Sequence, residues 1–270
     1  MMKHIAEMTR DEAAGVRFVL MDIDDTLTRE GKLPLESYAA LWMLKDAGIR
    51  VVPVTGRPAG WCDLIAREWP VDGVIGENGA LAFWEEGRDG GGGNRPLLKQ
   101  EFHPQAARND HPALERVRTR ALAEVPGLRV AKDQFARLFD LALDFAEEEP
   151  VLSLEEAERV RRIAEEEGAM AKVSSIHVNV WMGTYDKLTM AERFLSRRFG
   201  WRSGSGGREV VFVGDSPNDE PMFARFPLSC GVANIRRYTG LIKHEPAFAA
   251  EREFGAGFSE IARTILEKKR

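Results

Sequence analysis

The sequence of 270 residues predicts an α/β fold in which a Rossmann-like core with a parallel sheet carries an inserted α+β domain. Three observations favour this fold class. Short apolar runs without polar alternation, such as residues 16–22, are typical of strands buried on both faces of a parallel sheet. Strand-like and helix-like segments alternate near both ends of the chain, whereas residues 83–185 follow another pattern. The length also suits one large core with an additional domain.

The first part of the core is expected to contain three strands joined by two helices. The predicted segments are strands at 16–22, 49–54 and 72–76, and helices at 35–49 and 59–69. In the first helix, apolar residues recur at helical spacing between Pro34, tolerated near a helix start, and Gly48 near its end. The alternation of strands and helices in this part of the chain is typical of a parallel sheet with right-handed crossovers.

The middle of the chain predicts a separate domain, after which the core pattern resumes. Residues 87–94, GRDGGGGN, indicate a turn or linker without regular structure. The inserted domain is expected to contain helices at 104–124 and 153–167 and strands at 135–146 and 175–182. The returning core is expected to contain helices at 186–199, 217–225 and 258–268 and strands at 209–215 and 228–232. We therefore expect a core at 1–82 and 186–270 and an inserted cap at 83–185.

Composition excludes several classes of protein. The 38 basic and 43 acidic residues give a net charge of −5, which argues against a nucleic-acid partner held by phosphate contacts. This acidic excess lies in residues 83–185, which hold 19 acidic and 14 basic side chains. No apolar run is long enough for a membrane span, and the N-terminus does not resemble a signal peptide. Cys62 and Cys230 form neither a disulfide framework nor a zinc motif, so we expect a cytoplasmic protein.

Polar clusters follow three predicted core strands. They are Asp22 to Thr28, then Thr55-Gly56-Arg57, then Gly214 to Asp219, and Lys187 begins the helix on which the chain returns to the core. In open parallel sheets, ligands bind beyond the carboxyl ends of the strands. We therefore expect these clusters to form one site.

Acidic residues dominate this predicted site. Asp22, Asp24, Asp215 and Asp219 at one edge would repel one another unless a divalent cation and Lys187 neutralise them. Ligands that are all oxygen atoms favour a hard ion, most simply Mg²⁺. A carboxylate is ionised at neutral pH, so it can attack phosphorus without a base once the phosphoryl oxygens are neutralised.

Four motifs in this order resemble those of the haloacid dehalogenase-like phosphohydrolase superfamily. They are DxDxT at Asp22, Asp24 and Thr26; Thr55; Lys187; and GDxxxD at Gly214, Asp215, Asn218 and Asp219. The resemblance implies that Asp22 is the nucleophile and forms an aspartyl-phosphate, and that Asp24 is the general acid and base. It also implies that Asp22, the backbone oxygen of Asp24 and Asp215 hold the metal, with Asp219 close by. Thr55 and the Gly56 amide are suited to hold the phosphoryl oxygens.

The inserted segment resembles the cap of the type IIB subfamily, which includes sugar phosphatases and phosphomannomutase. In Gly76-Glu77-Asn78-Gly79-Ala80, Asn78 would reach the substrate near the hinge, and Asn218 is a further candidate for substrate binding. Arg57 could meet the substrate or pair with a core acid. The expected ligand is a small phosphorylated metabolite, most plausibly a sugar phosphate. The cap joins the core near 80–84 and 183–186, where it could open and close.

Alternation in two cap strands predicts which side chains face the substrate. Phe139, Leu141, Leu143 and Phe145 share one face of the first strand, and Ile176, Val178, Val180 and Met182 share one face of the second. We expect these apolar faces to pack on the cap helices. The opposite faces would look onto the core with Asp140, Asp144, His177, Asn179 and Trp181, of which Asp140, His177 and Asn179 are candidates for substrate binding.

Three alternatives remain open at this stage. A phosphomutase would need a second phosphate site, to which Lys132, Arg137 and Lys172 could contribute. A metal-dependent glycosyltransferase of the DxD type would not need a nucleophilic Asp22. A sugar-phosphate sensor would not turn substrate over. The sequence determines neither the exact substrate nor the oligomeric state.

Overall fold

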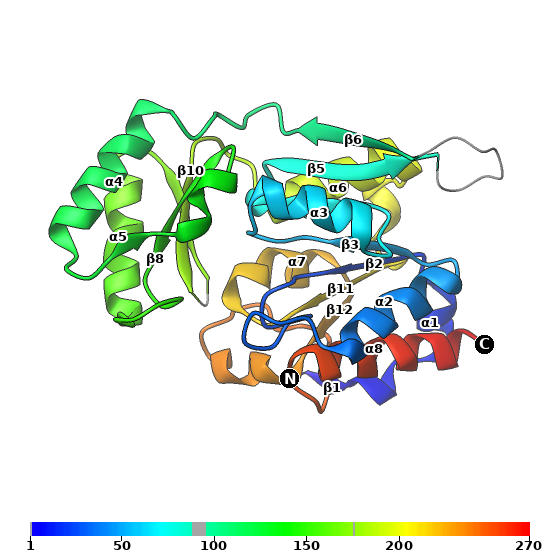
Figure 1. Ribbon diagram of the computed structural model, residues 1–270. Helices are drawn as coiled ribbons and strands as arrows, with labels where there is room; N and C mark the ends of the chain where they lie inside the picture. The colour runs from blue at the N-terminus through cyan, green and yellow to red at the C-terminus, as the bar shows by residue number, and fades with distance from the viewer. Residues whose placement is uncertain (1, 88–95, 175) are drawn as a thin grey trace.

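The computed structural model describes residues 2–87, 96–174 and 176–270. Its core is a six-stranded sheet with the strand order β1-β13-β12-β11-β2-β3, and all neighbours run parallel. The strands are β1 (Lys3–His4), β2 (Phe18–Met21), β3 (Arg50–Pro53), β11 (Val210–Gly214), β12 (Leu228–Gly231) and β13 (Phe248–Ala249). The predicted fold class, a parallel-sheet α/β core with an inserted domain, is confirmed (Figure 1).

Helices cover both faces of the core sheet (Figure 1). On one face, α1 (Arg10–Gly15), α2 (Leu35–Asp46) and α8 (Phe254–Lys269) pack with Val19 and Met21 of β2. On the other face, α6 (Lys187–Phe199) and α7 (Glu220–Arg225) pack with Phe18 and Leu20. Both faces of β2 are therefore buried, which explains its uninterrupted apolar sequence.

A second, smaller sheet adjoins the core. It contains β4 (Val74–Gly76), β5 (Leu81–Glu86) and β6 (Leu97–Phe102), all antiparallel, with α3 (Ala59–Glu68) packed against it. The strand expected at 72–76 is present as β4. It meets the end of β3 through the parallel Val54–Ile75 bridge, and along its length it pairs antiparallel with β5.

The linker predicted at 87–94 falls almost entirely on residues 88–95, which lie outside the described residues. The strands on either side of it, β5 and β6, pair with each other, and the buried side chains of β5 join the two core clusters. We propose on this basis that the cap begins after Phe102, whereas the sequence placed its start at residue 83.

The cap is a four-stranded antiparallel sheet covered on one face by two helices. The strand order is β7-β8-β10-β9, and the elements are α4 (Pro112–Glu124), β7 (Arg129–Val130), β8 (Asp140–Asp144), α5 (Leu154–Glu166), β9 (Met170–Val173) and β10 (His177–Trp181). Leu141, Leu143, Val178 and Val180 pack with these helices, as alternation predicts. Phe139 instead packs in the core cluster, because it precedes β8 and lies at the junction with the core.

Several element boundaries differ from the prediction. Helix α4 begins at Pro112 rather than at 104, because the His111 side chain accepts a hydrogen bond from the Ala113 amide and caps the helix there. The strand expected at 135–146 is limited to β8, since residues 132–136 form a short 3₁₀ helix. Strand β9 and the N-terminal β1 and α1 were not predicted.

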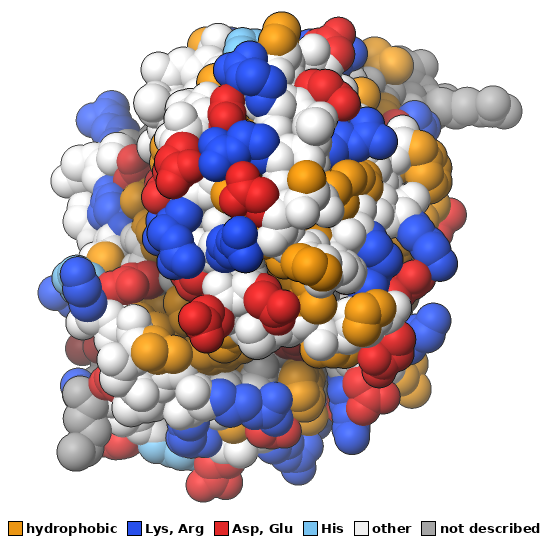
Figure 2. Space-filling view, turned by 90° about the vertical axis from the view of Figure 1, so that its left-hand side faces the viewer, with side chains coloured by type: hydrophobic (Ala, Val, Ile, Leu, Met, Phe, Trp, Pro, Cys, Tyr) orange, Lys and Arg blue, Asp and Glu red, His pale blue; other side chains and the backbone are white. Residues whose placement is uncertain are grey.

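The acidic excess of the insert does not form a patch on the helical face of the cap. Figure 2 shows basic and acidic side chains interspersed over this face. Arg116 and Arg120 pair with Glu167, and Arg161 pairs with Glu158. Exposed pairs of this kind contribute little to stability. None of the helices in the described parts of the chain is long and apolar enough to cross a membrane.

Candidate active site

The first acidic loop begins directly after β2, at the carboxyl edge of the core sheet. The Asp22 amide donates to the Val213 carbonyl, which extends the pairing of β2 with β11, and the Asp22 carboxylate accepts a hydrogen bond from the Ile23 amide at 2.8 Å. The Thr26 hydroxyl donates to Asp215 Oδ1 at 2.9 Å and so ties this loop to the next strand. Both acids are buried at the meeting point of two neighbouring strands.

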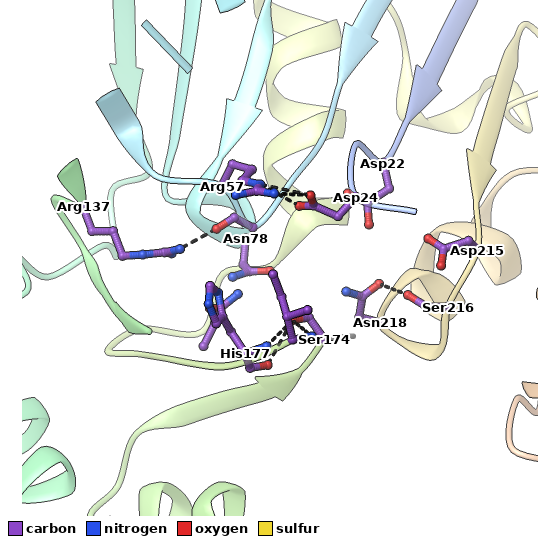
Figure 3. A pocket seen from close by; sticks show the side chains of 13 residues that line it. Asp22, Asp24, Arg57, Asn78, Arg137, Ser174, His177, Asp215, Ser216 and Asn218 are labelled. Carbon is purple, nitrogen blue, oxygen red and sulfur yellow. Dashed lines mark hydrogen bonds and ion pairs between the residues drawn. The ribbon is translucent and has the colours of Figure 1, made fainter. Parts of the chain in front are cut away.

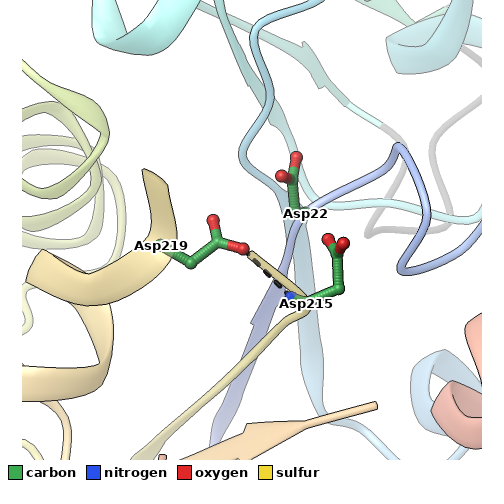
Figure 4. A group of neighbouring side chains, drawn as sticks. All are labelled: Asp22, Asp215 and Asp219. Atoms are coloured by element: carbon green, nitrogen blue, oxygen red, sulfur yellow. Dashed lines mark hydrogen bonds between the residues drawn. The ribbon is translucent and has the colours of Figure 1, made fainter. Parts of the chain in front are cut away.

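Asp22, Asp215 and Asp219 form a buried cluster of carboxylates (Figure 4). Each offers one oxygen, and these oxygens lie within 4.8 Å of one another. The Asp215 amide donates to Asp219 Oδ2 at 3.1 Å. A Cβ at Gly214 would overlap the Asp219 carboxylate, so the glycine of this motif is needed for the close approach.

Lys187 provides the positive charge nearest to this cluster. It is the first residue of α6, and the capping side chain of Asp186 fixes the start of the helix. Its Nζ lies 2.8 Å from Asp22 Oδ2 and 3.0 Å from Asp219 Oδ1. Burial acts to lower the pKa of Lys187, but the Asp219 and Asp22 carboxylates outweigh it and raise the pKa above its usual value.

One lysine does not neutralise three carboxylates. Burial raises the pKa of Asp22 to about 7; Lys187 opposes this rise, and the charges of Asp219 and Asp24 add to it. Burial and the Asp219 and Asp22 charges also raise the pKa of Asp215. A set of close, buried oxygen ligands with excess negative charge fits a hard divalent cation such as Mg²⁺.

The Asp24 side chain forms an ion pair with Arg57. Arg57 Nε lies 3.0 Å from both carboxylate oxygens of Asp24, and Nη2 lies 2.6 Å from Oδ1. The guanidinium also stacks over the Trp61 ring at 4.4 Å. The sequence left open whether Arg57 meets the substrate or pairs with a core acid, and the structure shows the pair.

The loop after β3 brings Thr55 and Gly56 to the same edge. Thr55 is fully buried, and its hydroxyl accepts a hydrogen bond from the Arg57 amide at 3.1 Å. A Cβ at Gly56 would lie 2.8 Å from Asn179 Nδ2 and 3.3 Å from both Asn78 amide atoms. The core loop, the hinge residue Asn78 and the cap residue Asn179 are therefore in close contact.

A cavity lies between these loops and the cap sheet (Figure 3). The volume accessible to the centre of a water molecule is about 30 Å³, which is room for about two waters. The predicted site residues that line it are Asp22, Asp24, Gly56, Arg57, Asn78, His177, Asn179, Asp215 and Asn218. Three predicted site residues of the core do not line the cavity: Lys187 and Asp219, which contact each other, and Thr55, which is fully buried.

Two cap residues lie in the cavity as predicted, whereas a third does not. His177 contacts Glu147 at 2.8 Å through Nε2, and Asn179 has a buried Oδ1 without a hydrogen-bond partner among the described residues. The Nδ2 of Asn78 is likewise buried without a described partner. Asp140 is completely buried and pairs with Arg137, so its side chain does not reach the cavity.

The remaining polar positions of the cap sheet are structural. Asp144 pairs with Arg129, and the Trp181 indole donates to the Tyr185 carbonyl at 3.2 Å. Four further residues line the cavity: Arg137, Ser174, Ile176 and Ser216. Arg137 was considered only for a second phosphate site, and the expectation that Ile176 packs on the cap helices is wrong. Ser216 lies inside the GDxxxD motif, so its position in the sequence could have predicted it as a site residue. Ser174 and Ile176 join β9 to β10, and no signal in the sequence predicted β9.

Comparisons with known proteins agree with this arrangement. The family model of haloacid dehalogenase-like hydrolases matches residues 19–91. The chain is 28% identical over 255 residues to a phosphoglycolate phosphatase of Pyrobaculum neutrophilum, covering 93% of this chain and 96% of that protein. The chain is therefore similar to haloacid dehalogenase-like hydrolases, and the two matches support an enzyme of the phosphatase type.

Solved structures share the fold along most of the chain. A Thermoplasma acidophilum protein, 0175, superimposes with a TM-score of 0.69 at 19% identity, covering 93% of this chain and 98% of that one. The subclass IIB sugar phosphatase BT4131 gives a TM-score of 0.60 at 16% identity, covering 92% and 98%. The chain thus has the same overall fold as these solved structures.

Proposed function

We propose that the protein is a Mg²⁺-dependent phosphatase that hydrolyses a small phosphorylated metabolite through an aspartyl-phosphate on Asp22. The observation that carries this proposal is the placement of Asp22. Its carboxylate lies at the cavity, in contact with Lys187 and beside Asp215, with Asp24 on the same cavity wall. A buried carboxylate is suited to attack a phosphoryl group when neighbouring cations neutralise the phosphoryl oxygens.

The proposed reaction has two displacements at phosphorus. In the first, an Asp22 oxygen forms a bond to phosphorus, the ester P–O bond breaks, and Asp24 gives a proton to the leaving oxygen. In the second, a water oxygen attacks the same phosphorus, Asp24 accepts a proton from that water, and the Asp22–phosphorus bond breaks. The products are the alcohol, orthophosphate and the free Asp22 carboxylate.

The Arg57 pair sets a condition on Asp24. Three contacts from the guanidinium occupy both carboxylate oxygens of Asp24. Donating a proton to the leaving group requires one of these oxygens to be free of Arg57, so this ion pair must loosen before the first displacement. Asp22, Asp215 and the backbone oxygen of Asp24 would hold Mg²⁺, with Asp219 close by, and the bound cation supplies charge neutralisation at the phosphoryl oxygens.

The relatives suggest two kinds of substrate. One solved structure is that of a sugar phosphatase, and the Pyrobaculum relative is named as a phosphatase of phosphoglycolate, a compact phosphorylated acid. We therefore keep two candidates, a sugar phosphate and a two- or three-carbon phosphorylated acid.

The charges around the cavity favour hydrolysis over a phosphomutase reaction. A second phosphate site needs cations that are not already neutralised. Arg137 is paired with Asp133 and Asp140, and Lys132 pairs with Glu148 at the surface. Of the three cations considered, Lys172 alone remains as a candidate for the second phosphate site.

Turnover of p-nitrophenyl phosphate and of a panel containing phosphoglycolate and sugar phosphates tests the proposal. We expect activity with Mg²⁺, its loss in EDTA, and its loss in Asp22→Asn. Asp63→Asn is the matched control, because Asp63 pairs with Arg67 on the outside of α3. Activity that survives in Asp22→Asn, or that is the same in EDTA, would contradict the proposal. Absence of turnover in the wild type would favour the sensor or glycosyltransferase alternatives.

A further inference from the structure

The cap and the core are joined beside the cavity by hydrogen bonds to a buried carboxylate. Glu77 belongs to the core side of the hinge, and its side chain is fully buried. Its Oε1 accepts hydrogen bonds from the amides of Ala59 at 2.9 Å and Leu138 at 2.8 Å. Its Oε2 accepts from Phe139 at 2.6 Å and Asp140 at 3.1 Å. The start of β8 is therefore fixed to the core at this point.

Arg137, immediately before this anchored segment, makes the reciprocal contact from the cap to the core. Its Nη1 donates to the carbonyl of Gly56 at 3.0 Å and to Asp140 at 3.0 Å. Its Nε and Nη2 donate to Asp133, each at 3.0 Å. The side chain is only 1% exposed, so these contacts hold the guanidinium in one orientation.

The Gly56 carbonyl belongs to a peptide group that is held at both ends. The amide of the same planar group, that of Arg57, donates to the Thr55 hydroxyl. Arg137 holds the carbonyl end (Figure 3). A peptide group fixed on both sides cannot rotate, and the Arg57 side chain that follows it reaches Asp24. The contact with Arg137 therefore bears on both the phosphate-binding loop and the partner of the proposed general acid.

We propose that Arg137 is a positioning residue through which the cap orders the Thr55-Gly56-Arg57 loop for binding the phosphoryl group. This inference rests on the proposed phosphatase function. Arg137 acts on the core backbone and not primarily on the substrate, because both edges of its guanidinium are engaged by Gly56, Asp133 and Asp140. The cap would then contribute to binding of the phosphoryl group that all substrates share, as well as to the choice of leaving group.

Orthophosphate is the suitable probe, since it has no leaving group for the cap to recognise. Its dissociation constant is measured by calorimetry in the presence of Mg²⁺ for the wild type, Arg137→Met and Arg129→Met. Arg129 is a matched control: it also pairs with a buried β8 aspartate, Asp144, but it otherwise donates to backbone carbonyls within the cap. Both variants lose the cation that pairs with a buried β8 aspartate, and only Arg137→Met loses the link to the core.

We expect Arg137→Met to raise the dissociation constant for orthophosphate by about tenfold, the effect of one lost charged hydrogen bond. Arg129→Met should stay within about twofold of the wild type, although both variants lose thermal stability. Equal effects of the two substitutions, or wild-type affinity in a folded Arg137→Met, would overturn the inference.

Two further measurements keep the test decisive. If Arg137→Met shows no cooperative thermal transition, Arg137→Lys and Arg129→Lys are compared in the same way, because lysine keeps the charge but not the forked geometry. A selective loss of orthophosphate affinity in Arg137→Lys supports the inference, and equal affinities overturn it. A wild type that neither binds orthophosphate nor hydrolyses phosphate esters contradicts the proposed function itself.

Discussion

Removing divalent cations should make the stability of this protein depend strongly on pH. In the metal-free protein, burial raises the pKa of Asp22 from 3.8 to about 7, opposed by Lys187 and reinforced by the charges of Asp219 and Asp24. The pKa of Asp215 is also raised well above 3.8, by burial first and then by the Asp219 and Asp22 charges. The folded protein therefore binds protons at pH values at which the unfolded chain has released them.

The sign and size of the effect follow from linkage. A raised folded-state pKa contributes stability that is fully present below pH 3.8 and is lost as the pH rises through about 7. One pKa unit corresponds to about 1.4 kcal/mol, so Asp22 alone contributes about 4 kcal/mol across this range. In a domain of this size that corresponds to roughly 10 °C in Tm. Bound Mg²⁺ stabilises the ionised carboxylates and should remove this dependence.

The assay is urea unfolding at pH values between about 5 and 8, in EDTA and in Mg²⁺. Stability should fall with rising pH in EDTA and much less in Mg²⁺. Asp140, whose burial raises its pKa to about 7 in spite of Arg137, lies outside the metal cluster and gives a residual slope in both conditions. Asp140→Asn should remove that residual slope alone. Equal pH slopes in EDTA and in Mg²⁺ would refute the reasoning that these carboxylates form the metal site.

Three further predictions concern single side chains. Lys187→Met should lower kcat by about 100- to 1000-fold, because it removes a buried cation from Asp22, while Mg²⁺ still raises the Tm; unchanged kcat would contradict this role. In single-turnover measurements of phosphoryl transfer to Asp22, Asp24→Asn should slow an alkyl phosphate by about 100-fold or more, and p-nitrophenyl phosphate less, because nitrophenolate leaves without a proton; equal losses in this step would remove Asp24 as the acid. Asn179→Ala should raise KM for the metabolite more than for p-nitrophenyl phosphate, whereas Asp140→Asn should change both by the same factor, since only Asn179 lines the cavity.

The core and its chemistry could be predicted because local signals coincide with the tertiary arrangement there. Phe18 and Leu20 pack on one face of β2 and Val19 and Met21 on the other, so a buried parallel strand leaves an uninterrupted apolar run. The carboxyl ends of such strands meet at one edge, which brings Asp22 beside Asp215 although the two are far apart in sequence.

The contacts of the cap could not be predicted, because alternation gives the face of a side chain but not its partner. Asp140 points away from the cap helices, as its position in β8 indicates. Its partner Arg137 is turned towards it by an irregular segment whose path depends on Glu77, about sixty residues earlier in the chain. The same dependence on distant partners applies to β4. Its antiparallel pairing depends on the neighbouring strand β5, and the sequence of β4 itself does not show which strand it pairs with.

The most direct test of the proposed mechanism is reduction of the enzyme with borohydride during turnover, followed by mass spectrometry. Borohydride converts an aspartyl-phosphate to homoserine, so the residue that carries the phosphoryl group is identified by its position. We expect homoserine at position 22 when both Mg²⁺ and a phosphate ester are present, and none when either is left out. Turnover without modification of Asp22, or homoserine at Asp24 or Asp215 instead, would contradict the assignment of Asp22 as the nucleophile.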